Sequence, residues 1–586
     1  MYVKILYIVS MYIATIPNRN SPPAVLLRES YREGGRVKNR TLANLTKLPA
    51  HIIEGLRRML KGERLVAPEE VFEIERTLPH GHIAAVLGTL RKLKLPGIIS
   101  SRGHRLQDLV VSMIVSRVIH PMSKLATALG LKGETAFSSL GELLGLEEVE
   151  DREMYRAMDW LLGRKEWIES KLAERHLQQG SPVLYDVTAV YFEGRKCKLA
   201  KLMNNGKGKK NKLQIGIGLL TNREGCPVGV QVFSGNLGDP STLKSQLQKL
   251  RQQFGLKKII LVADRGTLTD ARIEAELRLD EDLDWITALR APAIKELIEQ
   301  KSFAPELFDD WGIAEIHSGD YPGERLIVCK NPILAQKRSK KRQELLQATE
   351  AELGKVKEAT EREKWRLKGA DQIGLRVGKV LNRFKMAKHF ILDISDESLQ
   401  YRRNEDKIKA ESLLDGFYIV RTSVKVNKMG ADEVVKAYKD LSWVERAFRS
   451  LKTVDLKVRP VFHWLETRVR AHVFLCMLGY YVEWHMRRAL APLLYDDEDK
   501  QHAEERRKSV VAPAVSSDGA KRKAATKRTE EDEPVHSFRT LFQDLATLAK
   551  NWVNTKLAPG PSFPMYTNPT PFQEKVFKLL GFSYRM

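Results

Sequence analysis

The stretch VLYDVTAVYFEG, residues 183–194, predicts a buried β-strand that carries one carboxylate, Asp186, among apolar neighbours. Connections that contain glycine join it to the next two strand-like runs, which favours an antiparallel meander. A helical pattern at 242–255 separates the third run from the fourth, and a strand–helix–strand step favours parallel addition to the same sheet. The four later runs are LQIGIGLLT (213–221), PVGVQVFSG (227–235), KKIILVADRG (257–266) and LDWITALR (283–290).

Three antiparallel strands, a helix and a parallel strand follow one another in the order of the RNase H-like fold. The sequence therefore predicts an α/β protein with an RNase H-like mixed sheet flanked by helices. A charged helical stretch at 335–368 belongs to a long insertion after the fifth strand, and we interpret it as a solvated or coiled face, with a DNA-lining role as the alternative. An amphipathic helix at 431–452 and an apolar helix at 468–490 close the pattern.

The segments that flank this core have different residue patterns. A helical domain precedes it, and the run SKLATALGL (123–131) is compatible with either a DNA-binding helix-turn-helix or a plain helical bundle. The expected segments are a basic hairpin region (1–67), a helical domain that is a candidate DNA-binding domain (68–181), the first part of the catalytic core (182–290), the insertion (291–425), the last helices of the core (426–494), a flexible linker (495–535) and a helical tail (536–586).

The chain is strongly basic. Lysine and arginine total 98 against 74 aspartate and glutamate, which gives a formal net charge of +24. Such an excess suits a polyanionic partner, because each basic side chain that reaches a phosphate releases counterions. Nucleic acid is the leading candidate, and a basic protein without such a partner is the alternative.

The cysteines and the apolar segments exclude several classes. Cys197, Cys226, Cys329 and Cys476 are scattered without a CxxC pair, which argues against a disulfide framework and against a cysteine-based zinc site. The apolar residues 2–16 predict a strand or an upstream extension and not a secretory signal. No segment is long and uncharged enough to span a bilayer, so a membrane protein is not expected.

Two aspartates lie in the predicted sheet, one within a buried strand and the other at the end of a strand. Asp186 is costly among strand apolars unless it meets a cation or hydrogen-bond donors. Asp264 ends the fourth strand directly before Arg265 and Gly266, and carboxyl ends of strands face ligand crevices in α/β sheets. If the first and fourth strands are neighbours, both carboxylates converge at the centre of the sheet. Each aspartate alone could equally be a helix cap or a turn residue.

The predicted helix at 431–452 offers a third carboxylate, Glu445. Tyr438, Arg449 and Lys452 lie at helical spacing on the same face, beside the apolar stripe. An ordinary surface pair between Glu445 and Arg449 is the alternative, and the two aspartates favour the functional interpretation.

Three carboxylates without histidine suit hard cations such as Mg²⁺ or Mn²⁺. Two such ions about 3.5 to 4 Å apart can serve an in-line displacement at phosphorus. In that case Arg449, Lys452 and Arg265 would hold backbone phosphates, and Tyr438 would pack or hydrogen-bond along the same strand.

These residues resemble those of the DDE transposases of bacterial insertion sequences, in the branch with a Tyr-x2-Arg-x3-Glu-x6-Lys signature. Tyr438, Glu445 and Lys452 match the signature, whereas Leu441 stands in place of its arginine, and Arg446 or Arg449 is the candidate substitute. Asp186 and Asp264 match the first and second acidic motifs of the family. Further similar blocks are ESYREGGRV (29–37), SGNLGD (234–239), GFYIVRT (416–422) and RPVFHWLETRVRAHVFL (459–475).

The resemblance implies a cytoplasmic, nucleoid-associated bacterial enzyme that works as a homodimer or larger complex on DNA. Such an enzyme binds terminal inverted repeats, cuts the element free and joins its 3′ ends to target DNA with the same carboxylates and two Mg²⁺ or Mn²⁺ ions. The alternatives are an RNase H-like nuclease and an inactive DNA-binding remnant. ATP is not expected, because the basic loop GKGKKNK (206–212) lacks the G-x4-G-K-[ST] order.

Overall fold

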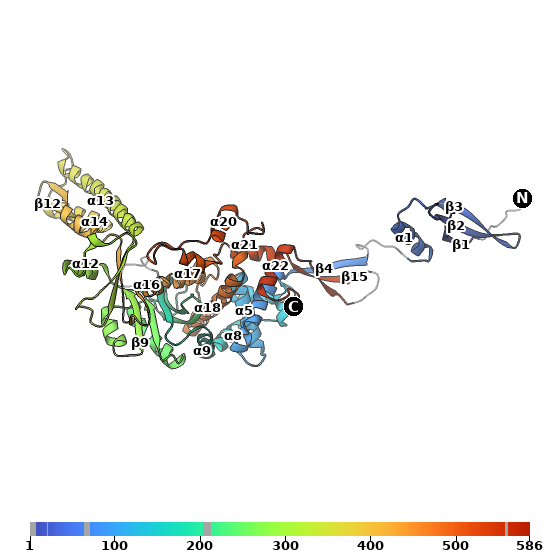
Figure 1. Ribbon diagram of the computed structural model, residues 1–586, viewed down its shortest axis with the longest axis horizontal. Coiled ribbons are helices and arrows are strands. Elements are labelled where there is room, and N and C mark those ends of the chain that lie inside the picture. Colours follow the sequence, from blue (N-terminus) through green and yellow to red (C-terminus); the bar gives the residue numbers. More distant parts are fainter. Residues whose placement is uncertain (1–7, 20, 64–70, 203–211, 557–560) are drawn as a thin grey trace. The chain divides into compact units, whose positions relative to one another are not determined.

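The computed structural model describes residues 8–19, 21–63, 71–202, 212–556 and 561–586 (Figure 1). The chain divides into two compact units. One unit comprises Met1–Thr77 with Lys550–Thr567, and the other comprises Leu78–Ala549 with Asn568–Met586.

The smaller unit contains the predicted basic hairpin. Strands β2 (Ala24–Glu33) and β3 (Arg36–Asn44) pair antiparallel around Gly34 and Gly35, whose φ angles of 57° and 78° suit a two-residue hairpin turn. β1 (Ile8–Ile16) adds a third strand beside β2, which confirms a strand in the part of the apolar start that the structure describes. Helix α1 (Ala50–Leu60) follows the sheet.

A second small sheet corrects two predictions. Its strand order is β16 (Phe563–Tyr566), β15 (Ala549–Thr555) and β4 (Phe72–Pro79). The segment 68–181 is therefore not helical throughout, and neither is the predicted helical tail 536–586, in which α21 (Phe538–Leu545) is followed by β15. Pairing with β4, which is far away in sequence, and with the nearby β16 decides the conformation of β15, and helical periodicity could not reveal these partners.

Seven helices between residues 81 and 176 confirm the helical pattern predicted before the core. The long α18 (Glu466–Ala489) packs against α5 and α8 of this group, and its central residues are buried (Figure 1). The seven helices are α3 (Gly81–Lys92), α4 (Leu95–Ile99), α5 (Arg105–Ile119), α6 (Lys124–Leu131), α7 (Leu140–Leu144), α8 (Asp151–Gly163) and α9 (Lys165–His176).

Among the described residues, no single helix combines the length and the apolar composition that crossing a membrane requires. Only α5 and α6 taken together reach both, as a pair bent by 104°.

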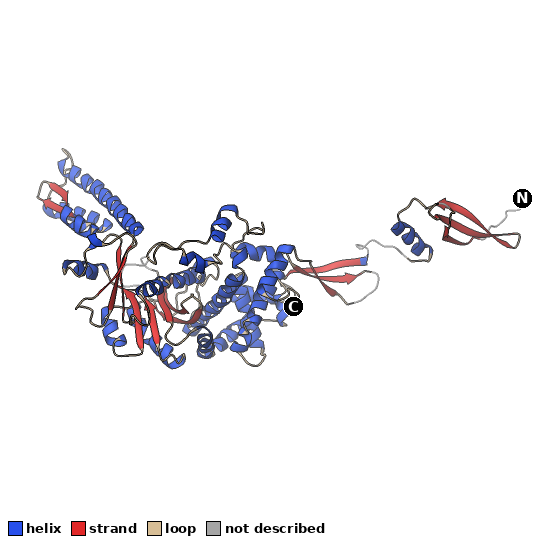
Figure 2. Ribbon diagram, viewed as in Figure 1, coloured by secondary structure: helices blue, strands red, loops and turns tan. Residues whose placement is uncertain are grey.

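The larger unit is organised around a mixed sheet of eight strands, drawn in red in Figure 2. All five predicted strands are present, and the first three pair antiparallel while β8 and β9 join β5 in parallel, as predicted. The helical segment predicted at 242–255 is α10 (Leu243–Gln248) followed by a π-helical turn, η2 (Lys249–Gln253). The strand order is β10 (Ile313–Ile316), β11 (Arg325–Lys330), β14 (Phe417–Thr422), β9 (Leu283–Ala288), β8 (Ile259–Ala263), β5 (Pro182–Tyr191), β6 (Gln214–Asn222) and β7 (Pro227–Ser234).

The segment predicted as an insertion, 291–425, is only partly separate from the core. After α12 (Ala291–Glu299), β10, β11 and β14 extend the sheet beyond β9 in antiparallel pairing. The remaining residues, 332–415, form an arm with a hydrophobic core of its own. The arm contains α13 (Pro332–Glu361), α14 (Ala370–Phe384), β12 (Phe390–Ile394), β13 (Leu399–Arg403) and α15 (Glu405–Ser412).

The arm leaves and rejoins the sheet at one point, which we call the neck. The N–H of Asn331 donates to the carbonyl of Gly416 over 2.9 Å, directly beyond the last pair of β11 and β14. Gly416 has a φ of +84°, and a Cβ there would lie 2.8 Å from the carbonyl oxygen of Asn331. The neck therefore requires glycine at position 416.

The predicted flexible linker at 495–535 is instead folded onto the larger unit. It contains α19 (Lys500–Glu505) and α20 (Asp518–Thr526), and Lys523 of α20 is 2% exposed. Its Nζ donates to the carbonyls of Ala491 and Asp496 over 2.8 and 2.9 Å. The charge-rich composition led to the prediction of a flexible linker. In the sequence, a lysine that donates to two main-chain carbonyls cannot be told from a solvated one. The terminal helix is α22 (Pro571–Leu580).

We predict that Lys523→Ala loosens the segment 495–535 and lowers the free energy of unfolding by about 1 to 3 kcal/mol, because buried carbonyls lose their donor. Hydrogen–deuterium exchange of the peptides from this segment, with chemical denaturation, measures both effects. Lys521→Ala is the matched control, because Lys521 lies on the same helix but is exposed. Equal exchange in the two variants would contradict the anchoring role.

Candidate active site

The pairing of β5 with β8 places Asp186 and Asp264 on neighbouring strands at the same level. Tyr185 is the register partner of Ala263, so the two aspartates occupy the next position on each strand. The Tyr185 side chain is fully buried, and its hydroxyl donates to Thr242 Oγ1 over 2.8 Å. Since successive side chains of a strand point to opposite faces, Tyr185 packs on one face of the sheet and Asp186 projects from the other.

The main chain orients both carboxylates. Asp264 Oδ1 accepts from the N–H groups of Gly266 and Thr267 over 3.1 and 2.8 Å, and Asp186 Oδ1 accepts from the N–H of Val187 over 2.8 Å. A Cβ at position 266 would lie 3.1 Å from Asp264 Oδ2. Glycine at this position therefore leaves room for the carboxylate at the end of β8.

Glu445 comes from a helical segment that packs on β5. The helix predicted at 431–452 consists of α16 (Ala431–Lys439), α17 (Leu441–Arg449) and a π-helical turn, η6 (Ser450–Val454). The apolar side of α17 is buried and contacts β5, whereas Glu445 is exposed.

The phenol of Tyr438 connects the three carboxylates. The pKa of Tyr438 is raised to about 12 by burial first and then by the charges of Asp264, Glu445 and Asp186, while Arg265 opposes them. All three carboxylates therefore lie within electrostatic reach of one hydroxyl group. The structure thus brings together the three acidic residues and the tyrosine that the sequence analysis selected.

Two of the predicted cationic residues lie beside these carboxylates. Lys452 Nζ donates to Thr188 Oγ1 on β5, and burial lowers the pKa of Lys452 while the charge of Asp186 raises it. Arg265 is exposed directly after Asp264 and lines a cavity of about 130 Å³ with Tyr438. Lys452 therefore lies beside the carboxylates in the turn η6 that follows α17, and Arg265 lies beside them directly after β8.

The remaining predicted contacts are placed differently. Arg449 is exposed on α17, whereas Arg446 forms an ion pair with Asp496 and so is held by the segment after α18. Leu441, which replaces the arginine of the signature, is partly buried against the hydrophobic core. Position 441 therefore contributes to packing in this chain.

Sequence reasoning missed Arg338 of α13. It lines the same cavity as Arg265 and Tyr438, and its guanidinium donates to the carbonyls of Leu414 and Phe417 over 3.0 and 3.2 Å. Burial lowers the pKa of Arg338, and the charge of Arg265 lowers it further. The first turns of α13 lie beside this cavity because β14 pairs with the sheet next to them. No local sequence pattern predicts that pairing. The basic loop predicted at 206–212 lies outside the described residues apart from Lys212.

The turn between β6 and β7 supports α17 from behind. Arg223 in this turn forms an ion pair of 2.8 Å with Asp440, which lies between α16 and α17. Gly225 has a φ of +83°, and a Cβ there would lie 2.7 Å from Cβ of Trp443 on α17. The turn and the helix that carries Glu445 are therefore in close contact.

We predict that Gly225→Ala lowers the free energy of unfolding by at least about 1 kcal/mol more than Gly180→Ala does, because only the first adds a clash with Trp443. Gly180 is the matched control, since its φ is +73° and a Cβ there meets nothing within 4 Å. Both variants incur the left-handed backbone cost of about 1 to 2 kcal/mol. Chemical denaturation measures the difference, and equal losses would contradict the close contact.

Comparison with known proteins assigns the class. A family model described as transposase DDE domain matches residues 178–481, which is just over half of the chain. The chain belongs to the DDE transposases, and DNA is therefore its partner. A second model, described as IS1634 family transposase, N-terminal domain, matches residues 13–70. The protein is thus a DDE transposase of the insertion-sequence type, which confirms the resemblance seen in the sequence.

Among solved structures, the chain is similar to that of the piggyBac transposase synaptic complex with hairpin DNA, determined by cryo-EM. The two are 9% identical with a TM-score of 0.32, and the match covers 79% of this chain and 76% of that chain. No curated protein matches this chain in sequence.

Proposed function

We propose that Asp186, Asp264 and Glu445 are the catalytic carboxylates of a cut-and-paste transposase, which cleaves DNA at the ends of its element and transfers the strands into target DNA. One observation carries this proposal: the parallel pairing of β5 with β8 puts Asp186 and Asp264 at the same level, and α17, which bears Glu445, packs on β5. The DDE family model spans all three positions, which supports the same assignment.

We also infer that residues 182–290 and 426–494 form one RNase H-like catalytic core. The order β7-β6-β5-β8-β9, with three antiparallel strands followed by two parallel ones, supports this inference. The arm and the strands β10, β11 and β14 are additions at the far edge of that sheet. The helices before residue 182 remain the candidate DNA-binding domain.

The donor set fits two Mg²⁺ or Mn²⁺ ions. Asp186, Asp264 and Glu445 offer only carboxylate oxygens, which these hard cations prefer. Their oxygens are not all within 4.8 Å of one another, and two separate ions do not require that all three carboxylates share one ligand shell. When bound, such ions supply Lewis acid activation at phosphorus.

The other side chains act on the DNA backbone. Lys452, Arg265 and Arg449 hold phosphates beside the carboxylates, because each presents a cation on that side of the sheet. Tyr438 keeps its proton at neutral pH, since its pKa is about 12, and can therefore donate a hydrogen bond to a phosphate oxygen. Arg446 reaches DNA only if its ion pair with Asp496 opens, so it ranks below the other three.

An element has two ends, and one active site at each end would allow both to be cut together. We therefore infer that the enzyme acts as a homodimer or larger complex on DNA that carries terminal inverted repeats.

We predict that Asp186→Asn, Asp264→Asn and Glu445→Gln each reduce Mg²⁺-dependent cleavage and strand transfer by at least about a thousandfold, or about 4 kcal/mol of transition-state stabilisation. A supercoiled donor plasmid with the element ends, incubated with target plasmid, reports both steps. Glu281→Gln, which neutralises an exposed carboxylate before β9, should retain activity. Full activity in any of the three variants would remove that residue from the site. Cleavage by the unaltered enzyme without strand transfer would favour the nuclease alternative.

We predict that Lys452→Ala weakens DNA binding and reduces the slope of log K against log salt by about 0.9, because one phosphate contact disappears. Fluorescence anisotropy with an end fragment at several salt concentrations measures the slope. Lys171→Ala is the control, because Lys171 on α9 forms an ion pair with Glu174 over 2.8 Å. An unchanged slope for Lys452→Ala would rule out the phosphate contact.

A further inference from the structure

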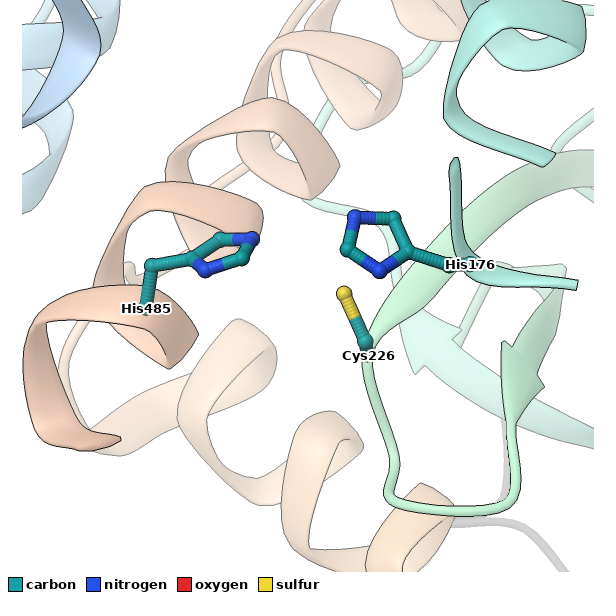
Figure 3. Close-up of side chains that lie close together, drawn as sticks. All are labelled: His176, Cys226 and His485. Atoms are coloured by element: carbon teal, nitrogen blue, oxygen red, sulfur yellow. The ribbon is translucent and has the colours of Figure 1, made fainter. Parts of the chain in front are cut away.

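Two histidines and one cysteine from three distant parts of the chain meet behind α17. His176 is the last residue of α9, Cys226 lies directly before β7, and His485 lies on α18. Their side chains point toward one another in Figure 3, and one ligand atom from each lies within 4.8 Å of the other two. We call these three residues the HCH cluster.

We propose that the HCH cluster is a structural zinc site, separate from the carboxylates. Two imidazole nitrogens and a thiolate are the borderline-soft donors that Zn²⁺ selects, whereas Mg²⁺ and Mn²⁺ select oxygen. In a tetrahedral zinc site the ligand atoms lie about 3.3 to 3.7 Å apart. The cluster therefore needs only a small inward movement, and a solvent molecule can fill the fourth position.

The hydrogen bonds of the two histidines suit such a site. His485 Nε2 is buried and has no hydrogen-bond partner within the described ranges, which is unfavourable unless a ligand satisfies it. His176 Nε2 lies 3.0 Å from the hydroxyl of Tyr481, which leaves Nδ1 for the metal. Ligating histidines commonly use their second ring nitrogen in this way, because it fixes the orientation of the ring.

The cysteine is also held in place. The N–H of Cys226 donates to Asn222 Oδ1 over 2.9 Å, and its carbonyl accepts from the N–H of Asn222 over 3.1 Å. The main chain of the β6–β7 turn is thus fixed around the thiol. Metal binding releases the thiol proton to solvent and forms the bond between sulfur and zinc.

A metal in the HCH cluster would restrain the β6–β7 turn, which packs against α17. The β6–β7 turn contacts Trp443 through Gly225 and Asp440 through Arg223. Zinc held by the HCH cluster would tie this turn to α9 and α18 and so restrict the helix that carries Glu445. The role is structural, since none of the three ligands is one of the proposed catalytic groups.

Metal retention by the full-length protein tests this proposal. After equilibration with ZnCl₂ and gel filtration, atomic absorption should find one zinc per chain that is lost in Cys226→Ser and in His485→Gln. Cys329→Ser should retain it, because Cys329 is also buried but lies on β11. No retained zinc, or equal zinc in all the variants, would overturn the proposal.

Cobalt substitution gives a second readout that does not depend on activity. Co²⁺ bound through Cys226 should show a charge-transfer band from the thiolate, absent in Cys226→Ser and unchanged in the double variant Asp186→Asn, Asp264→Asn. His485→Cys should keep the band, because it replaces one ligand with another, and so it decides the question if Cys226→Ser does not fold. Absence of the band in the unaltered protein, or its loss in the double variant, would overturn the assignment.

Discussion

The parallel pairing of β5 with β8 is the constraint on which the rest of the site depends. It brings residues from two strands, separated by β6, β7 and a helix, to the same level of one sheet. The alternation along β5 then gives Tyr185 and Asp186 opposite roles, since one fills the buried face and the other projects from it. A shift of one residue in β5 would exchange these faces, so the packing of Tyr185 against Thr242 also fixes the direction of the carboxylate.

The third carboxylate depends on packing of a different kind. Glu445 has no partner strand, and its place follows from the buried side of α17 against β5 and from the β6–β7 turn behind the helix. Three anionic groups around one phenol repel one another, and Lys452 and Arg265 reduce that repulsion from two sides. The same cations give the site its attraction for a phosphodiester backbone, so stability and binding use the same charges.

Sequence patterns predicted the parts of this molecule that depend on local order. The hydrophobic periodicity of each element was enough to predict five strands, the helix between β7 and β8 and the helices before the core. The three carboxylates could be selected because each has a recognisable position in its strand or helix. β15 and the return of β14 to the sheet depend on partners far away in the chain, which periodicity does not contain. The roles of Arg338 and Lys523 were not predicted for a related reason. In the sequence, a charged side chain that donates to a buried acceptor cannot be told from one that lies in water. The cysteine spacing argued against a cysteine-based zinc site, and it carries no information about histidines on other elements, such as His176 and His485.

The neck between Asn331 and Gly416 has a consequence for how this protein can change over evolutionary time. Because the chain leaves β11 and enters β14 at two hydrogen-bonded residues, the whole arm between them behaves as a side loop of a β-hairpin. A short turn could join the two strands without altering their register, and the arm has its own hydrophobic core to carry with it. Lineages can therefore lengthen, shorten or exchange this cassette while the sheet that bears the aspartates stays intact.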